Sequence, residues 1–566
     1  MSERQTPDTQ PVQTDPATQP PSWQRLFADL LAVIAVYAPI RFLLFPSVAL
    51  PKAFHLPADA YESGFVALRA LTFPNAIWWF ALSAALIGAH FIDVKGNPFF
   101  GKLRWNTTET PGIRIALMGL GLPIAWKLTT IDVNVYFDQV HALDRVLIAA
   151  LYLAMFRTPL AIPWFLGLSA AFFAQFHFPE CFHFTWADKA VLYYGMLLIW
   201  VAFIVSKVRR LDAAVVPALL LCLFASFYFY PGVTKLVKAG GPLTWLLFNP
   251  VYDLFMGAYA HGWWAGADFD ILLRVERFLR TFNLASTGFT MCLELGIVSI
   301  LLHRRLALLF LWSAVAFHAG VLLASGILFW EWWVPEFALL YLLHTRWKSN
   351  DVAHIFTNRL RFASPLLIVF ALPIFWPYAL GWLDSPYTAV YELEVQTGDS
   401  EWTPINRADL DPYNLPFTQN RFSFLVEEPI IHMGSYGAIT DRDLQIGLMA
   451  ATSVEELHAA LAPFEEVRAN AVDRAAFENF LQRYFANEAA RGGRTSVVPG
   501  FLESFHHQYA HAFITRPEPA PPVRRARMRM TEVWFDGEQQ HILSDQIVME
   551  IDVPVEAPPR YESPLE

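Results

Sequence analysis

Charged residues are scarce in this chain of 566 residues, and their scarcity narrows the class of protein. Asp, Glu, Lys and Arg together make up 16% of the sequence, whereas about a quarter is usual for a soluble protein. Apolar residues account for 55%, and aromatic residues, among them 20 Trp and 48 Phe, for 15%. Aromatic rings collect where a membrane meets water. The composition therefore predicts a protein whose main partner is the lipid bilayer, and the net charge of −10 argues against nucleic acid.

Cysteine is also scarce in this chain. The chain has three cysteines, Cys181, Cys222 and Cys292, and the last two fall within long apolar runs. Residues 384–566 contain none. A disulfide framework is therefore excluded for the C-terminal region.

The start of the chain lacks large apolar residues. Residues 1–22 are rich in Pro, Thr and Gln and contain no apolar residue larger than Val after the start Met, and such a segment cannot bury enough surface to become ordered. No charged-then-apolar leader with a small-residue cleavage site opens the chain. We expect residues 1–24 to form a disordered cytoplasmic tail.

Long apolar runs are what the chain has in quantity, and a run of about 20 such residues can cross a bilayer as a helix. We predict a polytopic α-helical membrane module over residues 25–383, with residues 240–283 as an interfacial or re-entrant insertion. The module would contain about eleven transmembrane helices, at 25–45, 74–93, 112–129, 143–156, 159–176, 189–206, 213–230, 286–302, 306–325, 327–345 and 363–383.

The distribution of basic residues predicts the orientation, because Lys and Arg stay in cytoplasmic loops. Connections 94–111, 207–212 and 346–362 are basic, whereas 130–142 and 177–188 contain no Lys or Arg. We therefore expect a multi-pass cell (inner) membrane protein with a cytoplasmic N-terminus and an extracytoplasmic C-terminal domain.

Residues 384–566 have a different pattern, with short alternating segments and more charge. Period-two alternation predicts strands at 390–395 and 525–530, and a third strand is expected at 541–553. Ser453-Val-Glu-Glu456 is a capping box that predicts a helix to about 463, and 472–486 indicates another. The region is expected to be an α+β extracytoplasmic domain with a Pro-rich tail, able to recognise a protein or peptide partner.

Three ionisable residues lie in or beside the apolar runs. Lys235 follows a Pro-Gly pair that we expect to end a helix at the outer interface, where the alternatives are an anchoring lysine and a desolvated base. Glu294 and His318 fall inside predicted spans, where an ionisable residue is by default a candidate functional group. Glu331 and Glu336 flank a Trp-Trp pair and are expected at an interface.

The segment Phe229–Leu236 (FYPGVTKL) resembles a signature of the vitamin K-dependent γ-carboxylase superfamily, whose membrane module is called HTTM. Glu294, the basic turn Arg304-Arg305 and the pair Phe317-His318 follow in the order expected of a bacterial-type member. The resemblance covers roughly residues 25–345. Where members commonly carry an Asn-His pair, this chain has Asp188-Lys189.

The resemblance implies a carboxylase-like lyase or ligase in which Lys235 is the base toward a reduced, vitamin K-like quinone. Glu294 and His318 complete the candidate catalytic set. The alternative is a non-catalytic assembly factor or membrane anchor whose outer domain recognises a partner. A cavity joining the three residues would favour the enzyme, whereas three separately paired residues would favour the scaffold.

A further polar cluster concerns metal binding. Glu503, His507 and His511 are spaced four residues apart and would share one face of a helix. Two histidines and a carboxylate can bind zinc, but no HExxH-type pattern accompanies them. We favour a solvated helix face and expect no metal site.

Overall fold

The structure is a computed structural model of the chain. It describes residues 23–45, 56–72, 76–91, 100–101, 104–105, 111–182, 187–212, 214–238, 240–241, 243–348, 352, 354–356, 358–398, 400–405, 410, 413–493, 495–507 and 522–560. All but the last two residues of the predicted tail lie outside this part of the chain.

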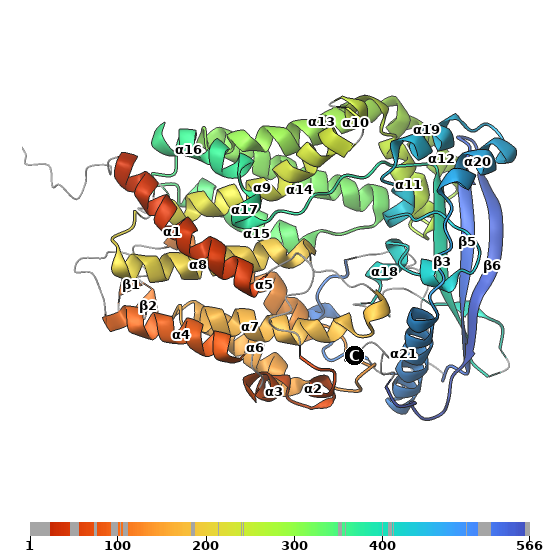
Figure 1. The fold of residues 1–566 in the computed structure, drawn as a ribbon, viewed down its shortest axis with the longest axis horizontal. Coiled ribbons are helices and arrows are strands. Elements are labelled where there is room, and N and C mark those ends of the chain that lie inside the picture. Colours follow the sequence, from red (N-terminus) through yellow and green to blue (C-terminus); the bar gives the residue numbers. More distant parts are fainter. Residues whose placement is uncertain are drawn as a thin grey trace, which may run out of the picture.

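Residues 23–375 form a helical part, and a sheet with a few helices lies at one end of it (Figure 1). Two short strands, β1 (Phe100–Gly101) and β2 (Arg104–Trp105), interrupt the helices. The helices are α1 Trp23–Leu44, α2 Asp59–Glu62, α3 Val66–Thr72, α4 Ala76–Phe91, α5 Pro111–Thr130, α6 Ala142–Met155, α7 Ala161–Phe173, α8 Ala187–Val208, α9 Val215–Lys238, α10 Thr244–Phe248, α11 Val251–Ala260, α12 Phe269–Thr281, α13 Asn283–Gly296, α14 Arg304–Ser325, α15 Trp330–Thr345, α16 Asn358–Val369 and α17 Leu372–Phe375.

The predicted fold class, with about eleven transmembrane helices, is wrong. Within the described residues, four helices are long and apolar enough to cross a membrane. They are Gln24–Leu44, Lys189–Val208, Val215–Lys238 and Arg304–Ser325.

The error has a physical cause, because hydropathy alone does not distinguish a helix facing lipid from a helix buried in protein. Several apolar runs form helices of 13 to 16 residues, among them α6, α7, α13 and α15. At 1.5 Å per residue these helices are shorter than the roughly 30 Å of bilayer hydrocarbon. The apolar windows of α8 and α9 are 89% buried inside the protein. Much of the apolar composition therefore serves an internal core.

The C-terminal part contains a four-stranded antiparallel sheet in the order β4-β3-β5-β6. Its strands are β3 Tyr387–Gln396, β4 Thr403–Pro404, β5 Arg525–Phe535 and β6 Gln540–Asp552. Helices α18 Leu415–Thr418, α19 Arg442–Ala450, α20 Val454–Leu461 and α21 Ala471–Ala490 accompany it. The strands and helices expected in this region are confirmed, and Ser453 Oγ accepts a hydrogen bond from the Glu456 backbone N–H as the capping box requires.

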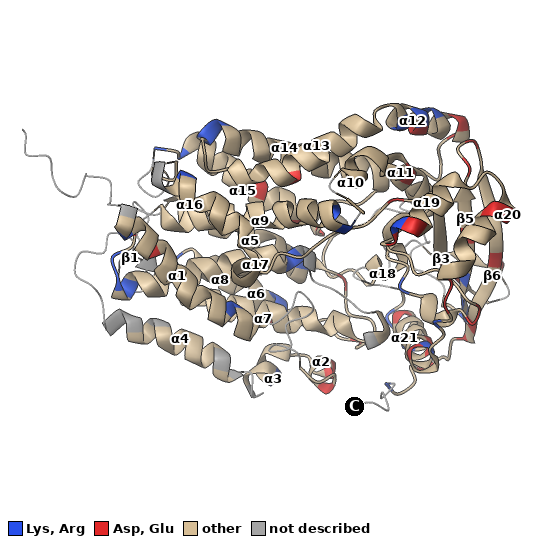
Figure 2. Ribbon diagram, turned by 45° about the horizontal axis from the view of Figure 1, so that its top comes forward, with Lys and Arg blue, Asp and Glu red and all other residues tan. Residues whose placement is uncertain are grey.

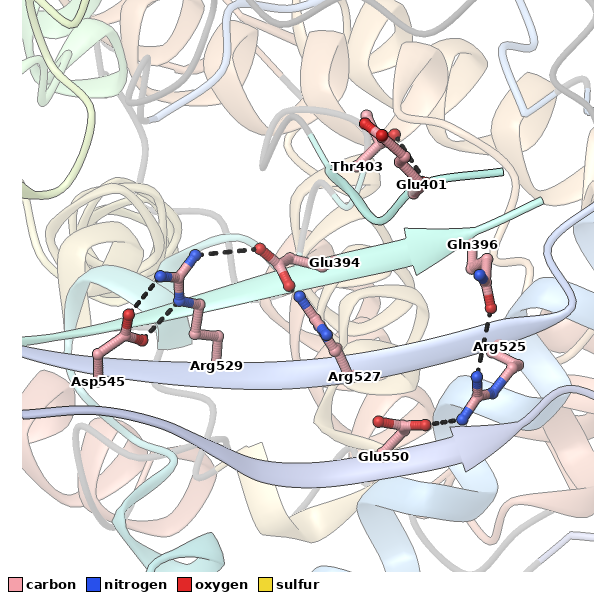
Figure 3. Close-up of polar contacts among 9 residues, drawn as sticks. All are labelled: Glu394, Gln396, Glu401, Thr403, Arg525, Arg527, Arg529, Asp545 and Glu550. Atoms are coloured by element: carbon pink, nitrogen blue, oxygen red, sulfur yellow. Dashed lines mark hydrogen bonds and ion pairs between the residues drawn. The ribbon is translucent and has the colours of Figure 1, made fainter. Parts of the chain in front are cut away.

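The two faces of the sheet differ because side chains alternate along a strand. Leu393 and Met528 point into the apolar core, while the arginines of β5 lie on the other face. Figure 3 shows these arginines bridging to carboxylates on both neighbouring strands. The ion pairs join Arg525 to Glu550, Arg527 to Glu394 and Arg529 to Asp545.

The sheet and the helices share one continuous core. Asn487 in α21 donates a hydrogen bond to the Val135 carbonyl over 2.8 Å, and Asn249 donates to the Asp384 carboxylate over 2.6 Å. Figure 2 shows that charged residues are sparse along the helices and gather around the sheet and α21. The C-terminal part therefore covers one end of the helical part, and the buried charges described next lie near that end.

Candidate functional site

Lys235 lies inside a helix, contrary to the expectation that Pro231-Gly232 ends one. Helix α9 runs without interruption from Val215 to Lys238, and Lys235 is in its last turn with its side chain buried. A lysine near the C-terminus of a helix is favoured by the helix dipole. The amine therefore points into the protein and not to an outer interface.

Gly232 allows the neighbouring helix to approach. A Cβ atom at this position would lie 2.9 Å from the Glu294 Cβ and 3.0 Å from the Leu295 Cδ2. Contacts closer than 3 Å force atoms to shift, so only glycine lets α9 and α13 pack at this distance. Gly232, one turn before Lys235, thus brings Glu294 within reach of the lysine.

Lys235 and Glu294 form a buried ion pair. The Lys235 Nζ lies 2.5 Å from the Glu294 Oε1, and the two side chains are 3% and 5% exposed. The Lys235 ammonium also lies 4.9 Å from the Trp245 ring centre and 5.3 Å from that of Trp382. Indole faces attract cations. The lysine is therefore enclosed by one carboxylate and two aromatic rings.

His318, in α14, belongs to a second buried group. The member of this group in α9 is Tyr228, which lies two turns before Lys235. The Tyr228 hydroxyl donates a hydrogen bond to the Glu336 Oε1 and lies 3.4 Å from the His318 Nε2. The His318 Nδ1 is 3.5 Å from the same Glu336 oxygen. Helices α9, α14 and α15 thus contribute one residue each to a buried Tyr–His–Glu group.

Three buried polar atoms of these two groups have no hydrogen-bond partner: the Glu294 Oε2, the Glu336 Oε2 and the His318 Nδ1. A buried polar atom without a partner costs free energy. Each of these atoms can make one further hydrogen bond. Both groups therefore have unused hydrogen-bonding capacity inside an apolar surrounding.

A third cluster is formed around Glu331, at the beginning of α15. The Glu331 carboxylate is 3.6 Å from the Lys189 Nζ and 3.9 Å from the His507 Nδ1. Lys127, Lys189 and Glu331 line a cavity of about 10 Å³, which is room for about one water molecule. The Phe329 ring stacks on His318 at 4.9 Å and meets His507 at 5.3 Å, so it separates this cluster from the Tyr–His–Glu group.

The solvated helix face expected for Glu503, His507 and His511 is wrong for residues 503–507, which do not form a helix. Residues 500–502 make one short 3-10 turn, and the following residues are irregular. The Glu503 carboxylate accepts a hydrogen bond from Ser496, while His507 contacts Glu331 instead. His511 lies outside the described residues. Within the part of the chain that the structure describes, no group of three or more His, Cys, Asp or Glu side chains is arranged to hold a metal ion.

Tyr228 was not predicted as a site residue, and the predicted position of the two glutamates of α15 is wrong. Glu331 and Glu336 are buried, at 2% and 0% exposure, and do not lie at an interface. The rule that singled out Glu294, a carboxylate within an apolar run, applies equally to Glu336. Tyr228 carries no comparable signal, because a tyrosine is common in aromatic-rich helices.

Comparison of the chain with models of protein families, with curated proteins and with solved structures found no match.

Proposed function

We propose that this chain is an integral membrane enzyme in which Lys235 and Glu294 transfer a proton to and from a lipid-soluble substrate with an acidic hydroxyl, of the reduced-quinone type. The observation that carries the proposal is the buried pair itself, with 2.5 Å between the Lys235 Nζ and the Glu294 Oε1. The resemblance of residues 229–236 to the carboxylase signature supports the same assignment of Lys235.

A buried ion pair is a costly way to hold two helices together. Removing two charges from water costs several kcal/mol per ion, and apolar residues of similar size are often as good or better for stability. Retaining both charges therefore favours a role in chemistry over a role in packing. The indole rings of Trp245 and Trp382 favour the charged amine and exclude water from it.

The pair can act as a base through an internal proton transfer. When the Lys235 ammonium gives its proton to the Glu294 carboxylate, both groups become neutral, and a neutral pair is well tolerated where the dielectric constant is low. The neutral Lys235 amine can then accept a proton from a substrate hydroxyl and become an ammonium again. The proton first received by Glu294 stays on its carboxyl group until the product leaves.

The surroundings fit an apolar ring system with hydroxyl groups. Trp245 and Trp382 supply flat aromatic surface beside Lys235, and the unpartnered Glu294 Oε2 is a hydrogen-bond acceptor. A bound hydroquinone would supply the acidic hydroxyl. Trp245 donates a hydrogen bond to the Trp382 carbonyl over 3.1 Å, so the two tryptophans close over Lys235. Entry of the substrate requires one of them to move.

We also propose that the chain lies in the cell membrane, with its N-terminus in the cytoplasm and residues 384–566 on the opposite side. Four candidate spans support a membrane location. The beginning of α1 lies at the end of the helical part that is farther from the sheet (Figure 1). Placing the N-terminal tail and the C-terminal part in different compartments requires an odd number of crossings, and therefore at least one crossing besides the four candidate spans.

The proposal is tested by the absorbance of a bound hydroquinone. Purified protein in lipid nanodiscs is titrated anaerobically with a naphthohydroquinone, whose deprotonated form absorbs at longer wavelength. We expect the red-shifted band with the wild type and its loss in Lys235→Arg, because arginine keeps the charge but does not release its proton. The matched control is Lys238→Arg, an exposed lysine one turn away on the same helix. An equal band in Lys235→Arg would overturn the proposal.

The second candidate is a non-catalytic assembly factor or anchor whose C-terminal part recognises a partner protein. The observation that favours it is that Lys235, Glu294 and His318 each have a partner inside the protein. In addition, neither the cavity beside Glu331 nor the pocket at α12 described below is lined by any of the three residues. For this function, Lys235→Arg should leave partner binding unchanged, and the absorbance band should be absent from the wild type.

A further inference from the structure

Helix α12 is strongly two-sided. Ile271, Val275 and Phe278 lie on one exposed stripe, with Ile271 54% and Phe278 60% exposed, and the stripe continues into Phe282. Leu272 is buried on the other side against the core. An exposed apolar stripe on a helix that also carries basic residues is typical of a helix lying at a membrane surface.

Three arginines follow the same helix at three-residue spacing, Arg274, Arg277 and Arg280. The last two line an open pocket of about 490 Å³ together with Thr281. The opposite wall is the turn between β5 and β6, residues 536–538, which contributes two carboxylates. Cationic and anionic side chains therefore face each other across one pocket.

The geometry of the two walls is set by contacts within each. Arg280 is held by Glu276 at 2.7 Å and lies over the Tyr252 ring at 4.8 Å. A Cβ atom at Gly537, whose φ of 101° favours glycine, would lie 3.4 Å from the Arg280 guanidinium. The turn therefore packs close to the arginine without covering it.

The anionic wall, residues 536–538, is also held in place by contacts with its neighbours in the turn. Asp536 contacts His541 at 2.6 Å and accepts hydrogen bonds from the backbone N–H groups of Glu538 and Gln539. Glu538, on this wall, and Arg277, on the other, are both exposed. One exposed cation and one exposed anion on opposite walls match a ligand that carries both charges.

We propose that this pocket binds the zwitterionic phosphoethanolamine headgroup of a membrane phospholipid. The phosphate oxygens would accept hydrogen bonds from the Arg277 and Arg280 guanidinium groups and from Thr281, since arginine pairs well with phosphate. The ammonium group would donate to the carboxylates of Asp536 and Glu538. Acyl chains would lie along the α12 stripe, which consists of Ile271, Val275, Phe278 and Phe282.

The charge pattern favours this ligand over other lipids. A purely anionic headgroup would leave the exposed Glu538 facing it without a counter-charge, and a quaternary ammonium has no N–H to donate to the carboxylates. The apolar surface continues from the α12 stripe onto α13, where Leu284 and Phe289 are exposed. The inference depends on the proposed membrane location but not on the chemistry of Lys235.

Native mass spectrometry of purified protein from mixed micelles tests the site. The micelles contain equal amounts of phosphatidylethanolamine, phosphatidylcholine and phosphatidylglycerol with identical acyl chains, and lipids retained on the protein are counted. We expect the wild type to retain phosphatidylethanolamine preferentially. Arg277→Gln should lower its retention by about tenfold, the size of one charged hydrogen bond. Glu538→Gln should abolish the preference over phosphatidylglycerol.

Arg274→Gln is the matched control, because Arg274 lies on the same helix, carries the same charge and does not line the pocket. Equal retention of the three lipids by the wild type would overturn the proposal, as would an equal loss in Arg274→Gln and Arg277→Gln. Soluble phosphoethanolamine that displaces the lipid at equal concentration would contradict the role of the α12 stripe. Arg277→Gln should leave the hydroquinone band intact, so a failure here is separable from a failure of the proposed enzyme.

Discussion

Replacing Lys235 by methionine is the sharpest test of the buried pair. The substitution keeps an unbranched side chain of similar length but leaves the Glu294 carboxylate charged and buried without its partner. The two side chains are 3% and 5% exposed, so water does not compensate the loss. We expect Lys235→Met to lower the free energy of unfolding substantially.

The magnitude follows from the contacts. Removing one partner of a buried ion pair costs about 3–5 kcal/mol. The ammonium also loses the two indole faces at 4.9 and 5.3 Å, each worth about 0.5–2 kcal/mol. Protonation of Glu294 in the variant would recover part of this loss. We therefore expect a net cost of about 4 kcal/mol.

The assay is chemical denaturation in one detergent, followed by circular dichroism, for the two single variants Lys235→Met and Glu294→Gln and for the double variant. In the double variant neither charge remains, so its cost should be at least about 2 kcal/mol smaller than the sum of the single costs. Lys238→Met, at an exposed position in the same last turn, should change stability by no more than about 0.5 kcal/mol.

Two results would refute the reasoning. A cost below about 1 kcal/mol for Lys235→Met would mean that Glu294 is not left buried and charged. Additive single effects in the double variant would mean that the two groups do not interact in solution.

Three other variants test neighbouring features of the structure. Gly232→Ala should separate α9 from α13, because the alanine Cβ would lie 2.9 Å from the Glu294 Cβ. The free energy of unfolding, measured by denaturation, should fall by about 1–3 kcal/mol. A variant as stable as the wild type would show that the helices do not pack this closely. Burial raises the pKa of Asp384 from 3.8 to about 6, so the folded state holds this proton more tightly than the unfolded state. The free energy of unfolding of the wild type should therefore fall by on the order of 3 kcal/mol as pH rises from about 4 to 6. The same pH dependence in Asp384→Asn as in the wild type would contradict this. Glu331→Gln should remove the carboxylate that lies 3.6 Å from the Lys189 ammonium and cost about 3 kcal/mol. An unchanged unfolding midpoint would show that the cluster is hydrated.

Local patterns predicted the C-terminal elements well. The alternation at 390–395 and 525–530 and the capping box at Ser453 depend on neighbouring residues, and all three appear as expected in β3, β5 and α20. The pattern at Pro231-Gly232 misled, because proline at this point does not end α9. The neighbouring Gly232 packs closely against α13, a contact that the local sequence does not describe.

The count of spans failed for a related reason. An apolar run predicts burial, but lipid and protein interior are both apolar surroundings. α7 and α8 are covered by other helices, whereas much of α14 is exposed, yet all three are apolar in sequence. Which helices face lipid depends on neighbours far away in the chain.

The sequence by itself determined that a few ionisable residues stand among many apolar ones, and that Lys235, Glu294 and His318 would be expensive unless they had partners. Only the tertiary structure decided which partners they have: Glu294 for Lys235, and Tyr228 with Glu336 for His318. The physical reason is the difference between local and long-range interactions. The cost of burying a charge belongs to the residue, but its compensation depends on contacts between helices that lie tens to more than a hundred residues apart in the chain.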